Sequence, residues 1–313
     1  MERRHFLKAF SGSLAAGTTS GCANLLNTIS GKEDLKAAKE QDKKTLGLAP
    51  SKPPVLVRAE APSAPAAKNV KPATKAERQA KSRQFSKTFE DDIFIDPRQI
   101  ATLKSINSKL WQTRKALGFG HFNLIGFDEL VKFCKYSSYV KELSKAELAF
   151  FDQMFHEDAK RYGFYGEKPI EKMTANILKK DAVKVKGTGH YVFKGEPLTL
   201  YNKIIKELGT SIVLTSGIRG VVKQMHLFLT KAISVDGNLS KASRSLAPPG
   251  HSFHGIGDFD VGKVGFGSYN FTDKFATTEE YKSLINSGYI QIRYTQDNPF
   301  GVRYEPWHIK VIS

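Results

Sequence analysis

Apolar residues recur at helical spacing through the middle of the chain. The clearest example starts at Ser144, where Ser144 and Glu147 form the S-x-x-E pattern of a helix capping box. Leu148, Phe151 and Phe155 follow at intervals of three and four residues, so they fall on one face of a helix. The sequence therefore predicts a helix that begins at Ser144 and buries this face.

Two further stretches have the same spacing. In LTLYNKIIKELG, the residues Leu200, Ile204 and Leu208 share a helical face, and Gly209 is the type of residue at which helices commonly end. In VVKQMHLFLTKAI (221–233), apolar residues again recur every three or four positions. We predict a helix in each stretch.

The spacing changes toward the C-terminus. The short apolar run SIVLTSG (211–217) is typical of a buried strand that leads into a loop. The stretches YIQIRYTQ (289–296) and WHIKVI (307–312) alternate as strands do. Helices first and strands last indicate an α+β fold whose small, mainly antiparallel sheet lies near the C-terminus.

The composition changes near residue 92. Residues 26–91 are rich in Ala, Lys, Pro and Ser and poor in large apolar residues. Such a stretch buries too little surface to offset the entropy of ordering its backbone. We predict a disordered basic linker over 26–91, a C-terminal domain over 186–313, and a helical segment over 92–185 that packs on this domain.

The first 25 residues differ from the linker. Their RRHFLK stretch resembles a twin-arginine export signal, and the apolar run after it is too short and too weakly apolar to span a membrane. The TSGC stretch resembles a lipoprotein cleavage box, which would leave Cys22 lipidated. The sequence thus predicts an exported, periplasmic protein with a lipid anchor at Cys22. A lipidated Cys22 excludes an internal disulfide, because Cys134 is the only other cysteine.

The net charge is +17, and about half of it lies outside the predicted globular part. Residues 1–90 carry 17 Lys and Arg against 8 Asp and Glu, a net charge of +9. An exported protein rarely meets nucleic acid, so we do not expect a nucleic-acid partner. Anionic cell wall and phospholipid headgroups are the partners that this charge favours.

Three separated stretches carry side chains suited to chemistry: SGIRGVVKQ (216–224), SFHGIGDFDV (252–261) and EPWH (305–308). Buried acids and histidines are costly unless they are paired or bound to a metal. In order and spacing, the three stretches resemble the zinc D-alanyl-D-alanine carboxypeptidase family. That family includes the vancomycin-resistance carboxypeptidases and is grouped with lysostaphin-type enzymes and hedgehog domains. The resemblance covers residues 186–313 and implies a hedgehog-like α+β fold whose sheet carries a zinc site.

The resemblance implies a Zn²⁺ cofactor with three protein ligands and one position left for water. The matching residues are His254, Asp260 and His308. Zinc hydrolysis also needs a carboxylate to move the proton of the water and a cation to balance the oxyanion. The matching residues for these two roles are Glu305 and Arg219.

The EPWH stretch needs a local irregularity to act in this way. In a regular strand, Glu305 and His308 would point to opposite faces. Pro306 cannot donate a hydrogen bond to a neighbouring strand, which favours an edge or a turn at this point. We therefore predict an irregular entry that turns Glu305 and His308 toward one metal ion.

The family pattern around the first ligand is Ser-x-His-x-x-Gly followed by an aspartate, with six residues between His and Asp. Ser252, His254 and Gly257 match this pattern, whereas Asp260 follows His254 with only five residues between them. This departure leaves two alternative ligands open. Asp258 would share a strand face with Asp260, and pairing His251 with Asp258 would restore the six-residue gap.

The stretch SGIRGVVKQ resembles the family's Ser-Gly-Tyr-Arg motif, with Ile218 in place of the aromatic residue. The rigid fork of Arg219 suits a carboxylate or a tetrahedral oxyanion. By the same resemblance, Ser252, Gln224 and Trp307 would bind substrate. We expect His190 to be structural rather than to line a cleft.

These residues together predict an exported zinc metallopeptidase that cleaves peptidoglycan stem peptides, with D-alanyl-D-alanine carboxypeptidase as the activity. The alternatives are an L,D-carboxypeptidase or an endopeptidase of the same fold, and a non-catalytic module that binds the cell wall. The Glu305 candidate favours an enzyme, because binding alone does not need a base. The residues alone support zinc-assisted amide hydrolysis, and the resemblance supplies the substrate class.

Overall fold

The computed structural model describes residues 73–311, which lie within one compact unit of the chain. The predicted export signal, the predicted lipidation site at Cys22 and the linker up to residue 72 lie outside the described residues. Within 73–311, no helix has both the length and the apolar character that crossing a bilayer requires.

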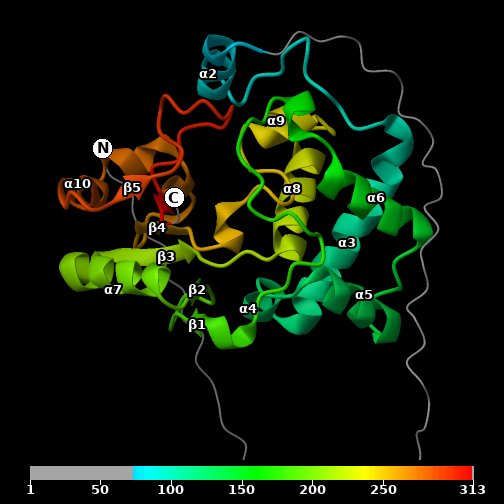
Figure 1. Ribbon diagram of the computed structural model, residues 1–313, viewed down its shortest axis with the longest axis horizontal. Coiled ribbons are helices and arrows are strands. Elements are labelled where there is room, and N and C mark those ends of the chain that lie inside the picture. The colour runs from blue at the N-terminus through cyan, green and yellow to red at the C-terminus, as the bar shows by residue number, and fades with distance from the viewer. Residues whose placement is uncertain (1–72, 312–313) are drawn as a thin grey trace, which may run out of the picture. The chain divides into compact units, whose positions relative to one another are not determined.

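Helices dominate the first part of the described chain, and short strands and loops dominate the last part (Figure 1). The helices are α2 (Lys75–Arg83), α3 (Ile100–Leu117), α4 (Phe119–Phe122), α5 (Phe127–Tyr136), α6 (Lys145–His156), α7 (Glu196–Leu208), α8 (Val221–Ser234), α9 (Leu239–Ser243) and α10 (Glu279–Asn286). The strands are β1 (Ala182–Lys184), β2 (Tyr191–Phe193), β3 (Ile212–Ser216), β4 (Phe259–Lys263), β5 (Gln291–Ile292) and β6 (His308–Lys310).

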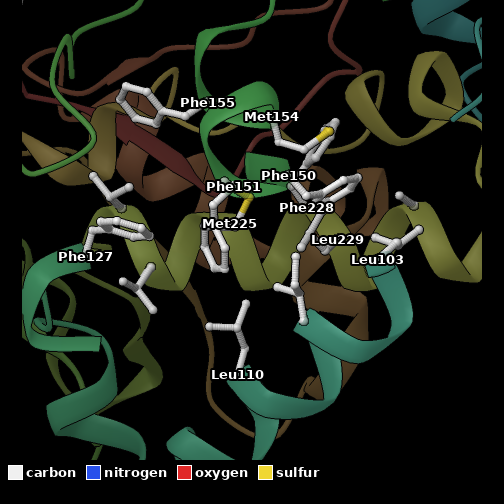
Figure 2. Packing of buried hydrophobic residues seen from close by; sticks show 14 of the residues in the cluster. Leu103, Leu110, Phe127, Phe150, Phe151, Met154, Phe155, Met225, Phe228 and Leu229 are labelled. Atoms are coloured by element: carbon white, nitrogen blue, oxygen red, sulfur yellow. The ribbon is translucent and has the colours of Figure 1, made fainter. Parts of the chain in front are cut away.

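One apolar core lies among the helices, and α8 runs through its middle. Figure 2 shows side chains of α3, α5 and α6 converging on α8. Because α8 is covered nearly all round, both its apolar residues and several polar ones are buried. The core includes Leu103, Leu110, Phe127, Phe150, Phe151, Met154, Phe155, Met225, Phe228 and Leu229.

The predicted start of α6 is confirmed. The Ser144 hydroxyl accepts a hydrogen bond from the Glu147 amide, and the Glu147 carboxylate accepts one from the Ser144 amide at 2.7 Å. Glu147 also accepts a hydrogen bond from Lys109 of α3 at 2.6 Å. The capping box therefore begins α6, and its Glu147 side chain also links α6 to α3.

Four strands form an antiparallel sheet in the order β3-β4-β6-β5. Its register places Ser216 opposite Asp260, and Asp260 opposite His308. A second apolar core joins this sheet to α7 and α10. The predicted α+β class, with helices followed by a small antiparallel sheet, is confirmed.

A separate antiparallel hairpin, β1–β2, crosses the predicted boundary between the helical segment and the C-terminal domain. Its strand β2 also supports the loop after β3, because the Tyr191 carbonyl accepts a hydrogen bond from Ile218 at 2.7 Å. A Cβ at Gly217 would lie only 1.9 Å from the Tyr191 oxygen, so this close approach requires glycine. The predicted boundary therefore divides elements that depend on each other.

The predicted linker is wrong at its C-terminal end. Residues 75–83 form α2, whose capping box pairs Thr74 with Glu77. The Arg78 guanidinium donates a hydrogen bond to the Pro299 carbonyl at 2.9 Å. Composition predicted disorder because α2 has little apolar surface, but polar contacts hold it to a loop more than 200 residues further along the chain.

Candidate functional site

Three predicted ligands meet at one point of the fold. His254 lies on a single turn of 3-10 helix, Asp260 on β4 and His308 at the start of β6. One nitrogen from each histidine and one oxygen from Asp260 all lie within 4.8 Å of one another. The antiparallel pairing of Asp260 with His308 brings residues 48 positions apart into contact with the same space.

The contacts of His254 leave one ring nitrogen for this space. Its Nδ1 atom lies 2.8 Å from the Gly217 carbonyl, which favours a proton on Nδ1 and a free lone pair on Nε2. The Nε2 atom is 3.1 Å from Asp260 Oδ1, but the two atoms lack hydrogen-bond geometry, and neither has a partner among the described residues. Two buried acceptors that face each other without a donor are the pattern that a bound cation satisfies.

Asp258 holds the other side of the His308 ring. Its carboxylate lies 3.0 Å from His308 Nε2 and also pairs with Arg293. The His308 Nδ1 atom therefore faces Asp260 Oδ1 at 3.5 Å and Glu305 Oε2 at 3.4 Å. Burial would lower the pKa of His308, but the hydrogen bonds to Asp258 and Glu305 and the charge of Asp260 raise it to about 9. The carboxylates of Asp258, Asp260 and Glu305 lie around the His308 ring, and their negative charge favours a cation at Nδ1.

The predicted irregular entry to the last strand is present. Pro306 and Trp307 form a turn in which the His308 amide donates to the Glu305 carbonyl at 3.1 Å. This turn brings Glu305 and His308 to the same side, as their contact shows. Glu305 is buried, with an exposed fraction of 7 %.

The structure does not place the two alternative ligands with the group. Asp258 precedes β4, so the strand-face argument does not apply to it, and its carboxylate binds the far nitrogen of His308. His251 Nδ1 lies 2.9 Å from the Glu167 carbonyl, and its ring packs edge-on against Phe164. Each side chain is therefore engaged elsewhere, and the structure groups His254, Asp260 and His308 without them.

Arg219 follows β3, in the loop that leads into α8. Its Nη2 atom donates to Asp260 Oδ2 at 2.5 Å and its Nε atom donates to the Ser216 hydroxyl at 2.8 Å. The Arg219 guanidinium helps to hold the pKa of Asp260 well below its usual range, although burial alone would raise it. Asp260 thus remains a carboxylate whose Oδ1 atom is left for the metal group.

A cavity of about 310 Å³ opens beside two of the three ligands, Asp260 and His308. Ser252 and Trp307 line it, as do Arg219 and Glu305. Gln224 is not in its lining: the amide nitrogen of Gln224 donates to the Ala247 carbonyl at 2.5 Å. This contact fixes the loop after α9, and the predicted substrate contact of Gln224 stays a prediction.

Sequence reasoning missed several residues of this cavity. Lys223, Tyr294 and Arg303 line it, and so does His190, for which we expected a purely structural role. The Tyr294 ring packs edge-on against His308 at 5.0 Å between centroids. The only sequence signal was the position of Lys223, four residues after Arg219 and directly before Gln224.

Comparison with known proteins indicates which protein family the chain is similar to. The family model described as VanY, D-alanyl-D-alanine carboxypeptidase, matches residues 197–313, the segment that contains the three ligands, Glu305 and Arg219. This segment is therefore similar to the VanY family of D-alanyl-D-alanine carboxypeptidases. A search of curated proteins found no match.

Solved structures similar to the chain include two carboxypeptidases. The LdcB LD-carboxypeptidase is 25 % identical, with a TM-score of 0.36 over 44 % of this chain and 71 % of that one. The vancomycin-resistance D,D-pentapeptidase VanY, solved as a point mutant with Zn(II), is 21 % identical, with a TM-score of 0.32 over 42 % of this chain and 78 % of that one. The VanYB structure with D-alanine-D-alanine gives the same identity and TM-score over 77 % of its chain.

The donor set of this segment suits zinc. Two imidazole nitrogens and one carboxylate oxygen are common ligands of catalytic zinc, and such sites keep a further position for water or substrate. Burial lowers the pKa of His254, which keeps its ring neutral as a ligand must be. The hydrogen bonds of Gly217 and Asp258 to the outer ring nitrogens would fix both imidazoles toward the metal.

Proposed function

We propose that the chain is an exported, zinc-dependent carboxypeptidase that removes the last residue of peptidoglycan stem peptides, with D-alanyl-D-alanine as the bond it cleaves. The observation that carries the proposal is the meeting of His254, Asp260 and His308 within 4.8 Å. They meet inside the segment that matches the D-alanyl-D-alanine carboxypeptidase family. The predicted export signal supports the same substrate, since peptidoglycan lies outside the cytoplasm.

The proposed roles follow from the contacts. Zinc held by the three ligands would supply a Lewis acid that polarises the peptide carbonyl and makes bound water more acidic. Glu305 lines the cavity beside His308, where its carboxylate can accept the proton of the attacking water. The same carboxylate then delivers a proton to the leaving amine. Arg219 lines the same cavity and balances the negative charge that develops on the carbonyl oxygen.

The Glu305→Gln variant tests the proposal. The amide cannot accept the proton, so we expect release of D-alanine from a pentapeptide muropeptide to fall at least about a hundredfold, the range typical of a lost general base. Zinc content should remain unchanged, because Glu305 is not one of the three ligands. Chromatography of digested muropeptides measures release, and elemental analysis of the purified protein measures zinc.

Two further variants make this result specific. His254→Ala should lose both zinc and activity, whereas Asp152→Asn, an exposed acid on α6, should change neither. Full activity in Glu305→Gln would refute the proposed role of the base. The digest also separates the alternatives: an L,D-carboxypeptidase would shorten tetrapeptides, and an endopeptidase would cut cross-links without releasing a single amino acid.

A further inference from the structure

The cavity beside the metal group extends along one face of α8. Lys223 and Leu227 line it from one face of α8, four residues apart, and Arg219 lines it from the loop just before the helix. Arg219 contacts Asp260 directly. Lys223 lies in the first turn of α8, four residues after Arg219 in the chain, and lines the same cavity.

Lys223 is the cation of this cavity that lacks an anion. Its exposed fraction is only 6 %, and it makes no ion pair or hydrogen bond with any residue of the described part of the chain. Its ammonium lies 5.3 Å from the centre of the Phe119 ring, a contact that offsets little of the cost of burial. Arg219 and Arg303, by contrast, already face Asp260 and Glu305.

The electrostatics of Lys223 agree with this geometry. Burial, together with the neighbouring charges of Arg114 and Arg219, lowers the pKa of Lys223 to about 7. No side chain of the described region offsets this cost with a negative charge. An anionic ligand in the cavity would remove the penalty by favouring the charged ammonium.

Two hydroxyls complete the wall. Thr215 lies at the irregularity between Leu214 and Ser216 where β3 departs from regular pairing with β4, and such bulges re-aim side chains next to active sites. Its Oγ1 atom and the Oγ atom of Ser245 are buried, line the cavity and have no hydrogen-bond partner among the described residues. A carboxylate accepts hydrogen bonds from both hydroxyls and from an ammonium.

We propose that Lys223 binds the free carboxylate of the last residue of the substrate, with Thr215 and Ser245 as hydrogen-bond donors. The proposal rests on the proposed function, because it places the scissile carbonyl at the metal group. Lys223 lines the same cavity as Asp260 and His308, so the proposal places the terminal carboxylate and the scissile carbonyl of one substrate in a single cavity. Lys223 would thus favour removal of one terminal residue over cleavage within a chain.

The experiment compares two substrates that differ only at this carboxylate. One is a stem peptide with a free C-terminal carboxylate, and the other is the same peptide with a C-terminal amide. Wild type should cleave the free acid with the higher kcat/KM. Lys223→Met should lower kcat/KM for the free acid about 10- to 100-fold, mainly through KM, and should leave the amide within about threefold, because the buried interaction is lost only for the acid.

Matched variants exclude a general effect on the fold. Lys223→Arg should keep much of the preference for the acid, and Lys231→Met, a lysine of α8 outside the cavity, should keep all of it. Zinc content should be equal in all four proteins. Equal losses on both substrates, or an unchanged preference in Lys223→Met, would overturn the role of Lys223 while leaving the proposed function intact. A wild type that cleaves neither peptide would overturn both proposals.

Discussion

The two histidines are oriented by what their outer nitrogens contact. His254 is held by a backbone carbonyl, which can only accept a hydrogen bond, and His308 is held by the Asp258 carboxylate. Each contact assigns the proton to the outer nitrogen and leaves the inner nitrogen as a ligand. The Asp258 carboxylate is itself held in place, since its second oxygen accepts hydrogen bonds from Arg293 and the Val311 amide.

Removing the charge of Asp258 should therefore weaken metal binding without removing a ligand. We expect Asp258→Asn to lower zinc affinity about 10- to 100-fold, as loss of outer hydrogen-bond partners of ligands generally does. Competition with a chromophoric chelator measures the affinity. An affinity within twofold of wild type would contradict the orienting role of Asp258.

A control separates orientation from stability, because Asp258→Asn also removes the carboxylate that faces Arg293. Arg293→Met disturbs the same buried pair but keeps the hydrogen bond between Asp258 and His308. We expect Arg293→Met to lower the melting temperature while zinc affinity falls much less than in Asp258→Asn. Thermal unfolding of both variants, recorded with and without zinc, makes the comparison.

At the scale of the elements, local signals could be predicted from the sequence and distant contacts could not. The capping box at Ser144 and the stop at Gly209 depend only on neighbouring residues, and both elements begin or end where expected. His254, Asp260 and His308 could be grouped because a family pattern records their spacing. The contacts of Asp258 with Arg293, and the place of Lys223 in the cavity, arise only when separate elements pack.

The α2 region is the clearest case in which contacts between distant residues could not be predicted from the sequence. Thr74 and Glu77 form a capping box that the sequence displays, but few apolar residues follow it, so composition indicated disorder. The structure instead anchors the chain after α2 through a buried ion pair. Arg244, which directly follows α9, makes two hydrogen bonds to Asp92 at 2.7 and 2.9 Å and a third to the Lys87 carbonyl.

Breaking this pair should destabilise the fold without touching the metal group. Removing one partner of a buried ion pair costs about 3–5 kcal/mol, because the other charge stays buried alone. At about 2–4 °C per kcal/mol for a domain of this size, we expect Arg244→Met to lower the melting temperature by roughly 6–20 °C. Differential scanning calorimetry measures the shift.

A second pair serves as the control for Arg244→Met. Arg98 and Asp96 also form an ion pair, but Arg98 is highly exposed. We expect Arg98→Met to leave the melting temperature within experimental error, because solvent screens such pairs. In the double variant Asp92→Asn/Arg244→Met, part of the lost stability should return, since neither charge is then buried alone. Equal shifts in Arg244→Met and Arg98→Met would show that the buried pair has no special role.

At the scale of the whole molecule, the segment before α3 connects the predicted tether to the rim of the cavity. Gln79 donates to the Asp297 carbonyl at 2.6 Å, and Arg83 pairs with the Asp297 carboxylate at 2.8 Å. The Arg303 guanidinium lies between the Phe85 and Trp307 rings, 4.9 Å from each centre, while lining the cavity. Residues 73–90 thus pack against the rim of the cavity.

Two truncations of different length should consequently behave differently. A protein that starts at residue 73 keeps every contact described for α2, so we expect its melting temperature and its kcat/KM on a soluble pentapeptide to match the full chain. A protein that starts at residue 91 loses the Phe85 ring, which packs on Arg303. Arg303 also lies 3.9 Å from the Glu305 carboxylate, so we expect lower thermal stability and a several-fold loss of turnover. Identical stability and turnover in the two truncations would show that residues 73–90 belong to the tether after all.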